Sequence, residues 1–209
     1  MTGNRKYYLG FTAASLRLTE MIRIESHVKE SSIDSYEEIE SPYLLINPAK
    51  KTTGTREFKE LIKRLEKLTP KQKNILITGD YTSQQQMAFL AVCKSYALVR
   101  DFTVEVLREK VGVYDYSLSE TDYLTFYRRK QDSHPELDTL AESTQKKLRQ
   151  VVFKILEQAG FINDLNNMTI QPQILGLEVI EAIIDDNSNW FKVFLLGDNE
   201  INELKQRHG

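Results

Sequence analysis

Two short stretches of this chain concentrate side chains that can bind phosphate. Residues 50–73 hold nine basic and three acidic side chains, and residues 128–154 hold seven basic and four acidic ones. Lysine and arginine neutralise phosphate oxygens, while hydroxyls and backbone amides at a helix N-terminus add hydrogen bonds. Because phosphate responds to the local potential, these two stretches predict anion binding despite a formal net charge of -2.

We expect one phosphate-binding patch in each stretch. The first contains Lys50, Lys51, Thr53, Thr55, Arg56, Lys59 and Lys63. The second contains Ser143, Thr144, Gln145, Lys146, Lys147, Arg149, Gln150 and Lys154. Gln145 and Gln150 are also candidates for base contacts, because a carboxamide can pair with an adenine edge. The alternative interpretation is two amphipathic helices whose solvent faces are basic and carry only weak surface ion pairs.

The sequence contains no pattern typical of a catalytic or metal centre. His27, His134 and His208 lack the spacing of metal ligands, and neither a glycine-rich phosphate loop nor a nucleophile elbow is present. Cys93 is the single cysteine and falls on an apolar stripe, which predicts a buried, inert thiol. We therefore expect no enzyme activity, no cofactor, no metal and no small-molecule substrate.

The first patch is expected on a helix over residues 55–68. Apolar residues in this segment recur every three or four positions and predict one buried stripe: Phe58, Leu61, Ile62, Leu65 and Leu68. A helix over 13–29, capped by Thr12, and a short segment over 35–40 precede it. The order of long helix, short helix and long helix is typical of a helix-turn-helix unit.

The second patch is expected on a helix that Ser143 or Thr144 caps and that Gly160 ends as a C-cap. A helix that starts near Ser119 and a short helix over 136–141 precede it. Residues 161–171 alternate like a small hairpin, so this unit reads as a winged helix-turn-helix. Phe153 lies on the polar side of the predicted helix, and we expect it to pack against another segment.

The predicted fold is a mainly α, multi-helix globular protein with two helix-turn-helix-like units, of which the C-terminal one is winged. We divide the chain into an N-terminal unit (1–73), central connecting helices (74–118), the winged unit (119–172) and an acidic helical tail (173–209). Ser83 is the expected cap of a central helix. No apolar run approaches the ~20 residues needed to span a bilayer, so we expect a cytoplasmic protein without a membrane partner.

A series of short motifs along residues 7–175 resembles the BrxA family of BREX phage-defence systems. The motifs are Phe11-Thr12-Ala13-Ala14-Ser15-Leu16-Arg17-Leu18-x-Glu20, Thr53-x-x-Arg56, Arg64-Leu65-x-x-Leu68, Cys93-Lys94-x-Tyr96, Asp101-Phe102, Asp122-Tyr123-x-x-Phe126, Ser143-Thr144-x-x-Lys147-Leu148-Arg149 and Leu156-x-x-Ala159-Gly160. Each motif is short, and their common order and spacing carry the resemblance.

The resemblance implies a compact helical protein that binds double-stranded DNA, acts beside other BREX proteins and has no catalytic centre of its own. Two other functions stay open at this point. One is a protein-interaction scaffold of the defence complex, and the other is an RNA-binding helical protein similar to antitermination factors.

Overall fold

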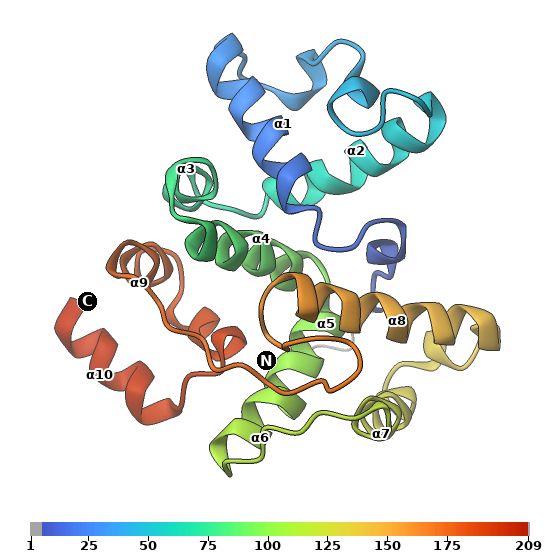
Figure 1. The fold of residues 1–209 in the computed structure, drawn as a ribbon, viewed down its shortest axis with the longest axis vertical. Helices are drawn as coiled ribbons and strands as arrows, with labels where there is room; N and C mark the ends of the chain where they lie inside the picture. The colour runs from blue at the N-terminus through green and yellow to red at the C-terminus, as the bar shows by residue number, and fades with distance from the viewer. Residues whose placement is uncertain (1–5, 209) are drawn as a thin grey trace.

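The structure, a computed structural model, describes residues 6–208 and is mainly helical (Figure 1), as the sequence predicted. The α-helices are α1 (Leu18–Ser31), α2 (Lys51–Leu65), α3 (Pro70–Thr78), α4 (Tyr81–Ser95), α5 (Ala97–Phe102), α6 (Arg108–Gly112), α7 (Glu120–Gln131), α8 (Glu142–Gln158), α9 (Leu177–Ile184) and α10 (Asp198–His208). Short 3-10 helices are η1 (Gly10–Ala13), η2 (Tyr36–Glu38), η3 (Pro42–Leu45), η5 (Pro135–Leu137) and η6 (Ser188–Phe194). A π-helical turn, η4 (Thr103–Leu107), joins α5 to α6.

Helix α4 forms the centre of the molecule. Figure 1 shows it below α1 and α2 and above α5, with α9 and α8 on its two sides. Every residue from Gln86 to Cys93 is buried, and α4 contacts α1, α2, α3, α5 and η6. A helix that is apolar on all sides is stable only when other elements surround it. The packing of α4 therefore fixes the position of α2, the helix that carries the first basic patch.

Cys93 lies fully buried in α4, as the sequence predicted, and burial raises the pKa of its thiol. Because the thiolate is the reactive species, we expect Cys93 to resist a thiol reagent such as dithiobisnitrobenzoate in the native protein. The reaction rate, followed by absorbance across a urea titration, should rise only in the unfolding transition. Rapid labelling without urea would contradict this expectation.

Local signals set several of the helix ends as predicted. Ser119 and Asp122 form a reciprocal capping box at the start of α7. Gly160 has a φ of 75° directly after α8, and its amide and that of Phe161 bond back to the last turn of that helix. This positive φ is the left-handed conformation that glycine adopts without strain, so the helix ends there.

Other predicted helix starts are wrong. Helix α1 begins at Leu18 and not at Ala13, because Arg17 takes a left-handed backbone conformation with a φ of 56°. Helix α2 begins at Lys51, which places Thr53 and Thr55 inside the helix. Helix α8 begins at Glu142 after Ala141, so neither of the two expected hydroxyl residues caps it. Asp80, and not Ser83, caps α4.

The predicted β-wing is also wrong, since the described chain contains no strand around residues 161–171. Two isolated antiparallel bridges, Ile162 with Ile170 and Ser117 with Thr169, take its place. The Asp164 carboxylate accepts hydrogen bonds from the backbone amides of Asn166 and Asn167, which folds the segment into a tight loop. Backbone bonding is thereby divided between two partner segments, and no ladder forms.

The acidic tail packs against the body of the protein. Lys71 of α3 bonds Asp185 at 2.9 Å, and Lys94 of α4 pairs with Asp186 at 2.7 Å. At the other end of the tail, Arg108 bonds Asp198 at 2.8 Å. Part of the negative charge of the tail therefore serves to dock α9 and α10. Among the helices of residues 6–208, none combines the length and the apolar character needed to cross a membrane.

Candidate nucleic-acid interface

The first predicted patch lies on the outer face of α2. Phe58, Leu61 and Leu65 are buried on its inner face. The opposite face lines a shallow surface groove that contains Lys51, Thr52, Thr55, Arg56, Lys59, Glu60 and Lys63. Lys50 and Thr53 are exposed at the N-terminal end of the same helix. We call the predicted residues of this stretch, Lys50, Lys51, Thr53, Thr55, Arg56, Lys59 and Lys63, the α2 patch.

Most cations of the α2 patch lack an acidic partner within residues 6–208. Only Lys63 forms an ion pair, at 3.4 Å from Glu60. Its Nζ also donates to the Tyr8 hydroxyl at 2.5 Å, and this bond raises the pKa of Lys63, so the side chain stays charged. The Thr55 hydroxyl donates to the Lys51 carbonyl inside the helix. The remaining charges, those of Lys50, Lys51, Arg56 and Lys59, face solvent.

The second patch is partly divided by the structure. Ser143, Lys146, Lys147 and Gln150 are exposed on the outer face of α8, and Thr144 is exposed beside them. Lys154 follows on the same face and pairs with Glu157. Gln145 instead donates its amide to the Leu140 carbonyl at 2.9 Å. We call the predicted residues on this helix, Ser143, Thr144, Gln145, Lys146, Lys147, Arg149, Gln150 and Lys154, the α8 patch.

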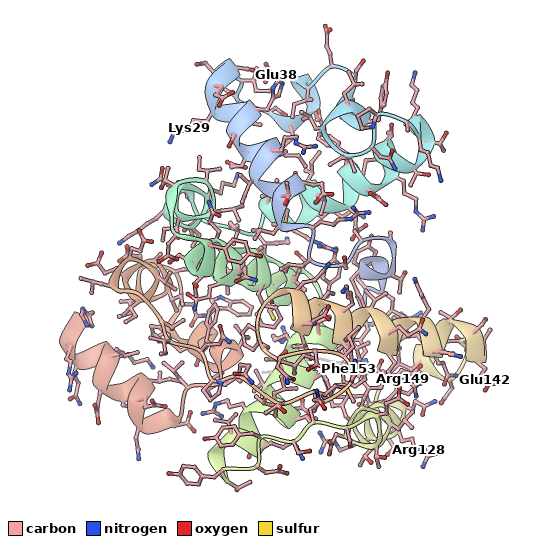
Figure 2. All side chains as sticks on the ribbon, in the orientation of Figure 1. Lys29, Glu38, Arg128, Glu142, Arg149 and Phe153 are labelled. Carbon is pink, nitrogen blue, oxygen red and sulfur yellow. The ribbon has the colours of Figure 1, made fainter. Side chains whose placement is uncertain are left out.

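Arg149 turns away from the outer face of α8. Figure 2 shows Arg149 and Phe153 on the side of the helix that faces α7. Arg149 lies 3.3 Å from the Glu120 carboxylate, and its side chain is 20% exposed. Phe153 is buried against Phe102 and Tyr123, which confirms that it packs against other segments. The guanidinium of Arg149 is therefore engaged between two helices and is less accessible than the neighbouring lysines.

The short helix η1 links the two patch-bearing helices. It lies between α2 and α8 in Figure 1 and contacts both. Three residues after η1, the Leu16 backbone amide donates to the side-chain oxygen of Gln158, the last residue of α8, at 3.0 Å. Residues 7–17 therefore couple α2 to α8.

Arg64, which is not among the predicted site residues, holds this linking segment. The side chain is fully buried, and its guanidinium donates to the carbonyls of Ala14, Ser15 and Leu16 at 2.5, 2.6 and 3.1 Å. Its Nε donates to the Tyr96 hydroxyl at 3.0 Å. The available signal was its position three residues after Leu61 on the apolar face, since a charged residue there must be buried and paired.

Glu60 completes the network below the α2 patch. Its two carboxylate oxygens accept hydrogen bonds from Tyr96 at 2.6 Å and Tyr8 at 2.8 Å. Burial alone would raise the pKa of this carboxyl, but the two hydroxyl donors and the Lys63 charge outweigh it and hold the pKa below its usual range. Glu60 is therefore a structural anion that pairs with Lys63 and connects to Arg64 through the Tyr96 hydroxyl.

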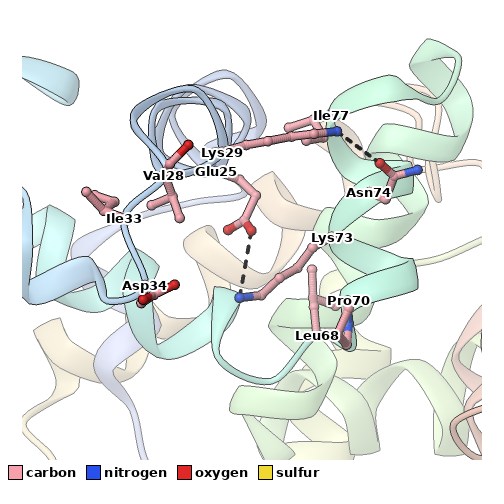
Figure 3. Close-up of a pocket in the computed structure, with 11 residues that line it drawn as sticks. Glu25, Val28, Lys29, Ile33, Asp34, Leu68, Pro70, Lys73, Asn74 and Ile77 are labelled. Atoms are coloured by element: carbon pink, nitrogen blue, oxygen red, sulfur yellow. Dashed lines mark hydrogen bonds and ion pairs between the residues drawn. The ribbon is translucent and has the colours of Figure 1, made fainter.

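A further cleft lies between α1 and α3 and contains no residue of either patch (Figure 3). Two bridges cross it, Glu25 to Lys73 at 3.8 Å and Lys29 to Asn74 at 3.3 Å. The Tyr36 hydroxyl donates to Glu25 at 2.6 Å and accepts from Lys73 at 2.7 Å. These polar and charged groups already form hydrogen bonds and an ion pair with one another. The contacts across the cleft therefore stabilise the packing of α1 against α3.

Comparison with known proteins relates the whole arrangement to one family. A family model described as BrxA matches residues 5–187. A BREX protein BrxA from Bacillus cereus (strain H3081.97) is 29% identical over 106 residues, which cover 50% of this chain and 53% of that relative. The chain thus aligns with about half of that relative's length. A BREX protein BrxA from Paramagnetospirillum magneticum (strain ATCC 700264 / AMB-1) is 22% identical over 138 residues, covering 66% of this chain and 69% of that relative.

The fold itself has a counterpart among solved structures. The crystal structure of an uncharacterized protein from Magnetospirillum magneticum superposes with a TM-score of 0.76 over 91% of this chain and 98% of that chain. The two sequences are 19% identical. At this identity the likeness shows a shared fold.

Proposed function

The chain belongs to the BrxA family, and from this membership we propose that it is a non-catalytic, double-stranded DNA-binding component of a BREX phage-defence system. The observation that supports DNA binding best is the α2 patch. Four of its cations face solvent without an acidic partner in the described part of the chain. A row of unpaired cations on one rigid helix is the electrostatic pattern that a phosphate backbone requires.

The spacing of the patch fits a run of phosphates. Lys51 and Lys59 are eight residues apart on α2, and a helix rises about 1.5 Å per residue, so they span roughly 12 Å. Successive phosphates on one strand advance roughly 3.4 Å along the duplex axis. The helix can therefore cover several consecutive phosphates of one strand. Contacts of this kind are independent of sequence.

The α8 patch would contribute a second group of contacts. Lys146 and Lys147 supply charge, and Ser143 and Thr144 supply hydroxyls in the first turn, where free backbone amides also favour phosphate. Gln150 is exposed and can reach a base edge, whereas Gln145 already donates to Leu140. We accordingly propose weak sequence preference, with Gln150 as the residue that carries it.

Salt dependence tests this proposal. If about six phosphates are contacted, the logarithm of the association constant should fall against the logarithm of salt concentration with a slope near -5. The measurement is a titration of the purified protein with a labelled duplex of about 40 base pairs at several salt concentrations, since counterion release sets the slope. A structured RNA serves as competitor.

The two remaining functions predict different results. A scaffold predicts salt-insensitive DNA binding or none, together with a BREX protein that co-purifies. An antitermination-type RNA-binding protein predicts that the structured RNA displaces the duplex. The acidic tail forms ion pairs with the body of the protein, such as Lys94 with Asp186. These pairs leave less exposed negative charge on the tail for a partner protein to bind, which makes the scaffold function less favoured.

A further inference from the structure

A cleft separate from both patches lies between the π-helical turn and η6. It has a volume of about 480 Å³, within the range of roughly 300–1,000 Å³ usual for small-molecule sites. The side chains that can meet a ligand there are Arg100, Val104, Asn187, Asn189, Trp190 and Lys192. None of these residues belongs to the α2 or the α8 patch.

The two carboxylates of this cleft are already neutralised. Asp101 accepts hydrogen bonds from Tyr7 at 2.8 Å and from Arg100 at 2.9 Å. Glu105 accepts from Lys130 at 2.5 Å and from Arg129 at 2.8 Å. With both acids saturated, the groups that remain for a ligand are mainly hydrogen-bond donors and cations. The cleft therefore favours an anion over a cation.

Several donors around the cleft have no partner within residues 6–208, and the Lys192 ammonium has only an exposed carboxylate as its partner. Arg100 uses its Nε and one terminal nitrogen on Asp101, which leaves the other terminal nitrogen, while Lys192 lies 3.6 Å from the exposed Asp198 carboxylate. Neither the side-chain amide of Asn189 nor the indole N–H of Trp190 forms a hydrogen bond in this part of the chain. The half-buried Trp190 ring adds a flat apolar wall.

The π-helical turn marks the same place independently. In η4 the Arg108 amide bonds to the Thr103 carbonyl, five residues back, and the Thr103 hydroxyl is buried against the Val99 carbonyl. Val104 and Glu105 of this turn line the cleft. Short π-helical segments cost helix stability and occur frequently at functional sites. The π-helical turn therefore lies at the wall of the cleft.

We propose that this cleft binds a nucleoside monophosphate unit. Lys94 Nζ lies 5.7 Å from the centroid of the Trp190 ring, and the remaining indole surface can stack on a base. The Asn187 Oδ1 already accepts from the Asn189 backbone amide, so the Asn187 side-chain NH2 and the Asn189 side chain are the groups that can hydrogen-bond the base edge. Arg100 and Lys192 supply the charge that a phosphate needs. The unit can come from a free nucleotide or from a nucleotide of a single strand, because both present the same base and phosphate. This site does not depend on the proposed duplex binding.

The single tryptophan of the chain makes the test direct, because all indole fluorescence reports from the cleft. We expect adenosine 5′-monophosphate to quench Trp190 fluorescence saturably, and adenosine and ribose 5-phosphate to bind at least about tenfold more weakly, since each retains only half of the contacts. Lys192→Gln should weaken binding of the monophosphate about tenfold. Lys205→Gln, the same charge change on α10, should leave it unchanged.

Thermal unfolding of both variants checks that each is folded, and Arg100→Gln provides a second variant in the cleft. The absence of saturable quenching would overturn the proposal, and so would equal affinity in the wild type, Lys192→Gln and Arg100→Gln. Displacement of the monophosphate by a short single-stranded oligonucleotide would assign the unit to a strand. Saturable binding without such displacement would assign it to free nucleotides. Neither result depends on whether the protein binds duplex DNA.

Discussion

Arg64→Met is expected to lower the free energy of unfolding by about 3–5 kcal/mol, the usual cost of removing one partner from a buried charged network. The guanidinium is fully buried and makes four hydrogen bonds, three of them to backbone carbonyls of residues 14–16. Methionine fills a similar volume but donates nothing. The three carbonyls and the Tyr96 hydroxyl then lose their donor.

Urea unfolding followed by far-ultraviolet circular dichroism measures this effect. Arg56→Met is the matched control, because Arg56 lies on the exposed face of the same helix. Substitutions at such exposed positions usually change stability by no more than about 0.5 kcal/mol. A loss below about 1 kcal/mol in Arg64→Met would show that solvent or another donor replaces the guanidinium, and that residues 14–16 are held by other contacts.

The contrast between these two arginines shows what the sequence could predict. The apolar stripe through Phe58, Leu61 and Leu65 correctly predicted which face of α2 is buried. Charge counting placed Arg56 and Arg64 together in one basic stretch. Helical periodicity distinguishes the two arginines. Arg64 lies three positions after Leu61, on the buried face, whereas Arg56 lies five positions before Leu61, on the exposed face. The identity of the carbonyls that Arg64 binds depends on how residues 14–16 pack, which no local pattern determines.

The same limit applies on α8. The apolar face of α8 and its end at Gly160 were predictable from the sequence, because helical periodicity and a left-handed C-terminal cap are local properties. Arg149 lies at the border between the polar and apolar faces, where the neighbouring helix decides its direction. Here Glu120 of α7 attracts it inward. The wing prediction failed for a related reason, since residues 168–171 divide their backbone hydrogen bonds between residues 161–163 and residues 116–118, and no local pattern predicts the second partner.

Replacing Lys51, Arg56 and Lys59 together with glutamine is expected to weaken duplex DNA binding by about 100- to 1,000-fold at roughly 0.1 M salt. Each lost phosphate contact removes about 0.9 from the slope of log K against log salt, so the slope should flatten by about 2.7. The three side chains form no ion pair with residues 6–208, and the substitutions should leave the free energy of unfolding nearly unchanged. Titration with the labelled duplex at several salt concentrations gives both quantities.

A control with the same loss of charge separates contact from net charge. Lys6→Gln, Lys205→Gln and Arg207→Gln remove three positive charges from exposed positions, one before η1 and two on α10. If net charge alone governed binding, this variant would weaken the duplex as much as the α2 variant does. If the α2 patch contacts phosphates, only the α2 variant flattens the slope. An unchanged slope in the α2 variant would exclude α2 from the interface. Among the predicted cations outside the α2 patch, the exposed Lys146 and Lys147 of α8 are those without an acidic partner in the described chain, so α8 would then be the helix that carries DNA binding.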